Sequence, residues 1–109
     1  MAESIIEQRL RIVPEFRPEE YAQVTEILSG KLDRRLSRWD AEQVELELSV
    51  KDRDTNSQRA VLECWISGLP KFVATSTERD LDAAVTEVRD DLFVQINRHV
   101  DKTTDQRRR

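Results

Sequence analysis

The stretch VELELSVKD, residues 44–52, alternates strictly between apolar and polar side chains, and it constrains the fold more than any other part of the sequence. One face of this segment would carry only apolar residues, namely Val44, Leu46, Leu48 and Val50. Such alternation is typical of a strand in a sheet that buries one face and leaves the other in solvent. Another layer of the protein must therefore cover the apolar face.

Two amphipathic helices are expected on either side of this strand in the sequence. In each, apolar residues recur every three or four positions and so share one face. The first helix, within residues 18–39, carries Tyr21, Val24, Leu28, Leu32, Leu36 and Trp39. The second, from about 81 to 102, carries Leu81, Ala84, Val85, Val88, Leu92 and Ile96. Thr77 and Asp80 resemble a capping box at the start of the second helix.

Three further strands complete the predicted order. They are expected at residues 9–13, 60–66 and 71–77. The predicted fold class is α+β with the order βαβββα, in which two roughly parallel helices pack on one face of a four-stranded sheet. Residues 1–102 would form this single domain, and the charged end 103–109 would be a disordered tail. The outer sheet face, with its glutamates and Trp65, would be open.

Composition and motifs exclude several functional classes. A chain of 109 residues suits one domain. The single Cys64 and the absence of a secretory signal or a long apolar run predict a soluble cytoplasmic protein without a membrane partner. His99, the one histidine, lies near the end of an expected helix with no nucleophile nearby in the sequence, which disfavours catalysis. Gly30 and Gly68 are the only glycines, so no phosphate-binding loop is present. We therefore expect no enzyme, cofactor, metal site or small-molecule substrate.

The stretch KLDRRLSRW, residues 31–39, concentrates positive charge in a chain whose net charge is −4. Helical spacing places Lys31, Arg34 and Arg38 on one flank of the first helix, with Arg35 at its boundary. If the helices lie side by side, a basic strip would also include the end of the second helix, at Arg98, His99 and Lys102. Such a strip suits phosphate, because each neutralised phosphate releases a counterion. The alternative is that these cations only stabilise helix C-termini, and the acidic pI of about 5.1 opposes nonspecific nucleic-acid binding.

The C-terminal part of the sequence resembles a known family. FVATSTERDLDAAVTEVRDDLFVQINRHVDK is similar, without gaps, to the end of the ribosome hibernation factors, the hibernation-promoting factor and ribosome-associated inhibitor A family. The positions that carry this resemblance are Asp80, Leu81, Ala83, Ala84, Val85, Leu92, Gln95 and the basic ending at Arg98, His99 and Lys102. Upstream, GKLDRRL resembles the end of the family's first helix and QVELELSVKD its second strand.

The resemblance implies a function. Family members place a βαβββα domain in the small-subunit channel where tRNA and mRNA would lie, and their helices contact 16S-type rRNA. They block initiation and preserve idle ribosomes in stress or stationary phase, without catalysis. This chain would be a short member, without the C-terminal dimerisation domain, and a monomer or weak homodimer. The residues expected to bind RNA are Lys31, Arg34, Arg35, Arg38, Arg98, His99 and Lys102, with Lys71 and Arg89 as further candidates.

The second helix departs from the family pattern. Asp82 stands where the family often has tyrosine, and Asp91, Val94 and Val100 stand where basic or polar residues are usual. This helix is therefore less basic than in the family. An alternative hypothesis is a protein-interaction module of the same fold that uses the open sheet face around Trp65 or dimerises along its sheet edge.

Overall fold

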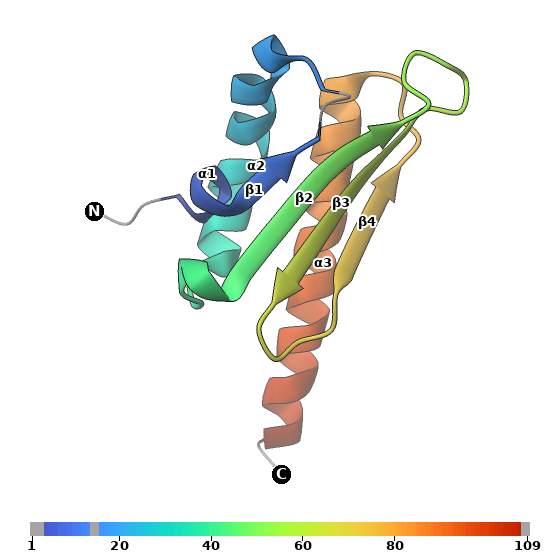
Figure 1. Ribbon diagram of the computed structural model, residues 1–109. Coiled ribbons are helices and arrows are strands. Elements are labelled where there is room, and N and C mark those ends of the chain that lie inside the picture. The colour runs from blue at the N-terminus through green and yellow to red at the C-terminus, as the bar shows by residue number, and fades with distance from the viewer. Residues whose placement is uncertain (1–3, 14–15, 108–109) are drawn as a thin grey trace.

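The computed structural model describes residues 4–13 and 16–107, with side chains described up to Val100 (Figure 1). Three α-helices, four strands and two 3-10 turns follow one another in this part of the chain. In order they are α1 (Ile5–Arg9), β1 (Leu10–Ile12), η1 (Pro18–Glu20), α2 (Tyr21–Leu36), η2 (Ala41–Gln43), β2 (Val44–Lys51), β3 (Arg59–Ile66), β4 (Phe72–Ser76) and α3 (Leu81–Arg107).

The four strands form one sheet in the order β1-β2-β3-β4. β1 runs parallel to β2, and the other neighbours are antiparallel. Figure 1 looks onto the open face of the sheet, with α2 and α3 lying behind the strands. Contacts join residue 23 to 82 and residue 31 to 90, so the two helices run in the same direction. The predicted α+β fold, with two parallel helices on one face of a four-stranded sheet, is confirmed.

The apolar faces predicted from the sequence meet in one core. The alternating residues of β2 face inward, and β3 and β4 contribute Ala60, Leu62, Cys64, Ile66, Phe72 and Ala74. The helices cover them with Val24, Leu28, Leu32 and Leu36 of α2 and Ala84, Val85, Val88, Leu92 and Ile96 of α3. Burial of apolar area contributes about 25 cal/mol per Å², which makes this two-layer contact the main source of stability.

The short helix α1 is an element that the sequence patterns did not predict. Ile5 and Ile6 are buried in the core, and Ser4 caps the helix by accepting a hydrogen bond from the Glu7 amide. Asp33 of α2 fixes α1 in place, since its carboxylate accepts hydrogen bonds from Ser4 Oγ at 2.6 Å and from the Ile6 amide at 2.9 Å. Asp33 therefore holds the N-terminal segment against α2.

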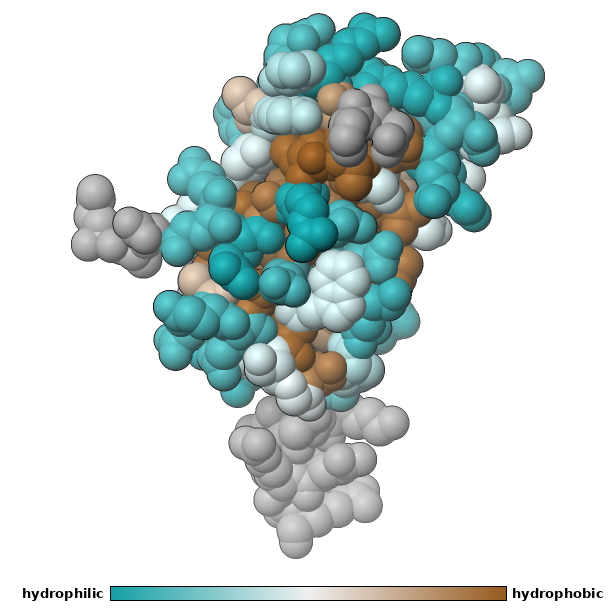
Figure 2. Space-filling model, in the orientation of Figure 1, coloured by the Kyte–Doolittle hydropathy of each residue, from teal (hydrophilic) through white to brown (hydrophobic). Residues whose placement is uncertain are grey.

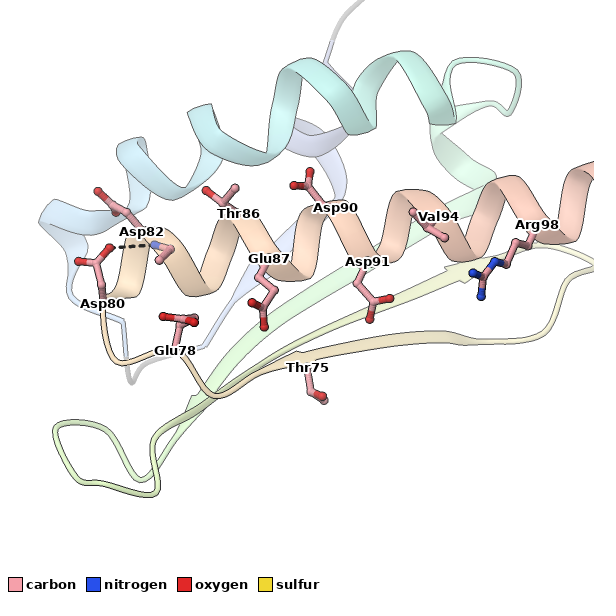
Figure 3. Close-up of a pocket in the computed structure, with 11 residues that line it drawn as sticks. Thr75, Glu78, Asp80, Asp82, Thr86, Glu87, Asp90, Asp91, Val94 and Arg98 are labelled. Atoms are coloured by element: carbon pink, nitrogen blue, oxygen red, sulfur yellow. Dashed lines mark hydrogen bonds between the residues drawn. The ribbon is translucent and has the colours of Figure 1, made fainter.

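The start of α3 differs from the prediction. Asp80 itself is the capping residue, because its carboxylate accepts a hydrogen bond from the Ala83 amide at 2.9 Å (Figure 3). The expected capping box from Thr77 is therefore wrong. Buried Gln58 supports this turn by donating to the Arg79 carbonyl at 3.1 Å. At its other end α3 runs to Arg107, beyond the expected end at residue 102. The predicted disordered tail, 103–109, falls on residues whose side chains lie outside the described structure, and it stays a prediction.

Candidate functional site

Three of the four cations predicted at the end of the first helix lie on α2, and the fourth, Arg38, lies in the turn that follows it. We call Lys31, Arg34, Arg35 and Arg38 the basic flank. The side chain of Lys31 faces α3, because its Nζ atom lies 3.1 Å from Asp90 of α3 and 4.6 Å from the ring centre of Phe93. Arg34 lies one turn after Lys31 and lines a concave surface with Ser4 and Asp33 near α1, whereas Arg38 lies just beyond the end of the helix. Both are exposed, and within the described residues neither forms an ion pair with a carboxylate.

One carboxylate of α3 forms ion pairs with two of the cations that are predicted to bind RNA. Asp90 accepts from Lys31 and also from Arg89, whose Nη2 atom lies 2.8 Å away. Arg89 also donates from Nη1 to the carbonyl of Ile27 at 3.3 Å, so it bridges the two helices. Burial raises the pKa of Asp90, but hydrogen bonds from Lys31 and Arg89 outweigh it and leave that pKa below its usual value. Lys31 and Arg89 are therefore partly neutralised within the chain.

Trp39 organises the end of the basic flank. The guanidinium carbons of Arg35 and Arg38 lie 5.9 Å and 5.2 Å from the centre of its ring. Cation–π contacts of this kind hold a guanidinium over the ring without neutralising its charge. Two nitrogens of Arg35, Nε and Nη2, are buried and have no hydrogen-bond partner in the described part of the chain. The apolar spacing of the sequence places Trp39 only among the core-facing residues of the first helix, and it carries no signal for this role.

Arg98 is not brought together with the basic flank. It lines a shallow concave surface along α3 that includes Glu87, Asp90 and Asp91 (Figure 3). Glu87, Asp91 and Arg98 project from the side of α3 that lies away from α2, toward β4. The outward surface of α3 is therefore mainly acidic, in agreement with the departures from the family pattern in this helix.

The remaining predicted cations lie elsewhere. The ring of His99 meets the ring of Phe72 edge-to-face at 5.9 Å, which directs it toward the sheet. Lys71 lies on the opposite side of the molecule, where its Nζ atom is 3.0 Å from Glu63 and 5.7 Å from the ring centre of Trp65. Lys102 lies within α3, and its side chain is outside the part of the structure that is described.

The open sheet face carries paired charges around an apolar centre. Each of the three glutamates predicted there has a cationic partner: Arg9–Glu45 at 3.5 Å, Arg11–Glu47 at 3.4 Å and Lys71–Glu63 at 3.0 Å. Trp65 and Val73 remain 38% and 40% exposed. Figure 2 shows hydrophobic residues along the middle of this face, between hydrophilic residues on both sides. The face is therefore less acidic than its strand residues alone predict.

The described residues give little support for a cysteine nucleophile, a metal site or a membrane-spanning helix. Burial raises the pKa of the Cys64 thiol to about 12, so this cysteine is not a nucleophile at neutral pH. No group of three or more histidine, cysteine, aspartate or glutamate side chains is arranged to hold a metal ion in the part of the chain that the structure describes. Among the described helices, none is long and apolar enough to cross a membrane.

Comparison with known proteins identifies a related fold. No model of a protein family and no curated protein matches this chain. Among solved structures, the chain is similar to the crystal structure of the Thermus thermophilus Protein Y N-terminal domain, with a TM-score of 0.53 and 19% sequence identity. The match covers 83% of this chain and 94% of the Protein Y domain. At this identity the comparison shows that the two chains share a fold.

Proposed function

We propose that this chain is a cytoplasmic ribosome-binding factor of the hibernation type, which occupies the tRNA and mRNA channel of the small subunit without catalysing a reaction. The sequence resemblance to the hibernation factors supports this proposal. The shared fold with the Protein Y domain agrees with that resemblance. Inhibition of translation would follow from steric exclusion of tRNA and mRNA.

The basic flank of α2 is the observation that carries the proposal. Arg34 and Arg38 are exposed cations whose charge no described carboxylate neutralises, so they would make the strongest phosphate contacts. Arg35, whose guanidinium lies over the Trp39 ring, would add positive charge beside them. Lys31 and Arg89 would bind phosphate more weakly while they share Asp90. The cations outside this flank, Arg98, His99, Lys102 and Lys71, are proposed as peripheral contacts.

The unequal charge of the two helices would also orient the protein. RNA repels the acidic outward surface of α3, which includes Glu87 and Asp91, and attracts the end of α2. Since the overall charge of the chain is −4, binding would depend on this local orientation and not on a general attraction to polyanions. We therefore place the RNA backbone along α2, near Arg34, Arg38 and Trp39.

Co-sedimentation with purified small ribosomal subunits tests the proposal. We expect binding at about 50 mM salt and its loss near 200 mM, because released counterions drive the association. The Arg34→Glu, Arg38→Glu double variant should not bind while keeping its thermal unfolding transition. The matched control is Arg59→Glu with Arg79→Glu, which makes the same charge change at two exposed positions outside the basic flank. Loss in both double variants, or binding by the Arg34, Arg38 variant, would contradict the proposed interface.

A second candidate function is a protein-interaction module of the same fold. The exposed Trp65 and Val73 on the open sheet face favour it, since large apolar side chains in solvent are common at interfaces. In that case the basic flank would not be needed, and substitution of Trp65 would abolish the function.

A further inference from the structure

The edge strand β4 leaves main-chain groups without a strand partner. The direction of these groups follows from the sheet register. The Ser67 amide donates to the Gln43 carbonyl at 2.9 Å, so odd-numbered residues of β3 bond to β2 and even-numbered ones bond to β4. Leu62 of β3 is opposite Ala74 of β4, which leaves Val73 and Thr75 with main-chain groups that point away from the sheet.

This edge has few of the features that normally prevent association. The sequence of β4, FVATS, contains no charged residue and no proline, the usual protection of an exposed edge. Val73 is 40% exposed. The single protecting contact in the described structure is from Gln95 of α3, whose Nε2 atom donates to the Val73 carbonyl at 2.8 Å. A carbonyl has two acceptor positions, so Val73 can accept a second hydrogen bond.

The side of α3 above this edge carries a regular row of side chains. Glu87, Asp91, Val94 and Arg98 are spaced by four, three and four residues and follow one line along the helix (Figure 3). We call this row the α3 seam. Val94 is 41% exposed and is the apolar member of this row. The seam is acidic at its N-terminal end and basic at its C-terminal end.

We infer that the β4 edge and the α3 seam form a two-fold interface with a second copy of this chain. Antiparallel pairing of two β4 strands about Ala74 places Val73 of one copy opposite Thr75 of the other, and all the outward main-chain groups of these two residues then bond. The same two-fold axis places the α3 seam of the second copy antiparallel to that of the first. Glu87 then meets Arg98 of the other copy, and Asp91 meets Val94.

The spacing of the layers agrees with this arrangement. Neighbouring strands lie about 4.8 Å apart, and α3 lies over β3 and β4, so the two α3 helices would be about 10 Å apart. That is the usual distance for packed helices. The interface uses the side of α3 away from α2, so the basic flanks of both copies remain exposed. The inference therefore does not depend on the proposed ribosome binding.

Sedimentation equilibrium of the purified chain over a wide concentration range tests the interface. We expect a reversible monomer–dimer equilibrium in the wild-type protein. Either Glu87→Arg or Arg98→Glu should raise the dissociation constant by about tenfold or more, because each substitution creates two like-charge contacts across the axis. The double variant with both reversals should restore dimerisation. The matched control is Glu26→Arg, an exposed position of α2 outside the interface.

A backbone variant tests the strand pairing separately. Thr75→Pro removes an amide that points away from the sheet, a position where an edge strand tolerates proline. The monomer should keep its fold, as judged by circular dichroism, and the dimer should be lost. A wild-type protein that stays monomeric at all concentrations overturns the inference. Dimerisation that survives both Thr75→Pro and Glu87→Arg overturns it as well, because the copies then associate through another surface.

Discussion

The Nζ atom of Lys31 lies 3.1 Å from the carboxylate of Asp90, so α3 sets the effective charge of the surface on α2 that we propose meets RNA. The same carboxylate accepts from Arg89. A phosphate that approaches Lys31 must therefore compete with a carboxylate already in place. Arg34 and Arg38 face no such competition from the described residues. We therefore expect them to bind phosphate more strongly than Lys31 and Arg89.

Removal of the Asp90 charge should strengthen RNA binding. Asp90→Asn leaves Lys31 and Arg89 without an anionic partner, so each can neutralise a phosphate. The dependence of log K on log salt should steepen by about 1 for each additional phosphate that the protein neutralises. Co-sedimentation with small subunits across a salt series measures this slope. Asp91→Asn is the matched control, because it makes the same charge change at the neighbouring position, where the carboxylate bonds Gln95 rather than a cation. Weaker binding by Asp90→Asn would show that Asp90 positions the two cations for RNA.

Substitution of Trp65 separates the two candidate functions. Trp65→Ala removes a partly exposed aromatic residue from the open sheet face and should destabilise the fold by about 1 to 3 kcal/mol, since this residue is 38% exposed and the rest of its surface is buried. Ribosome binding through α2 should be unchanged. Co-sedimentation together with thermal unfolding checks both expectations. If the stable variant no longer binds ribosomes, the sheet face and not the basic flank carries the function.

The architecture could be predicted because its signals are periodic. The alternation of β2 and the apolar faces of α2 and α3 depend only on local spacing, and each was found where expected. The helix α1 has no such signal. Five residues are too few to show a helical period, and α1 depends on a tertiary contact with Asp33.

The candidate site could be predicted only in part, for a similar reason. Helical spacing predicts Lys31, Arg34 and Arg38 on one flank. In the structure Lys31 contacts α3, but α2 ends at Leu36 and Arg38 lies in the turn after it. The neutralisation of Lys31 by Asp90 depends on how two helices pack, which the sequence of either helix does not contain. The position of Arg98 did have a local signal, because it follows Asp91 by seven residues and so shares its side of α3.

The contact between Asp33 and α1 should control the order of the N-terminal segment. Asp33→Ala removes the acceptor for Ser4 Oγ and the Ile6 amide, and should destabilise the protein by about 1 to 2 kcal/mol. Hydrogen exchange should become faster at the amides of Ile6 and Glu7, while the amides of β3 should remain among the slowest to exchange. Glu26→Ala, at an exposed site on the same helix, is the control. Unchanged exchange in α1 would mean that burial of Ile5 and Ile6 alone holds this helix.

The ion pair between Glu20 and Arg53 should make stability depend on acid pH. Arg53 extends from the β2–β3 loop, between Asp52 and Asp54, whose φ angles are 52° and 67°. Its Nη1 atom donates to Glu20 at 2.8 Å. This hydrogen bond lowers the pKa of Glu20 from 4.5 to about 2, with smaller contributions from the Arg17 amide and from the charges of both arginines, against an opposing effect of burial.

The sign of the pH effect follows from that direction. Because the folded pKa lies below the unfolded value, the stabilisation is fully present above pH 4.5 and is lost as the pH falls toward 2. Glu20→Gln should therefore be less stable than the wild type by about 1 to 2 kcal/mol at pH 7. The difference should shrink steadily between pH 4.5 and 2. Urea denaturation of both proteins at a series of pH values measures it, and a difference that does not change with pH would show that the carboxylate contributes by its shape and not by its charge.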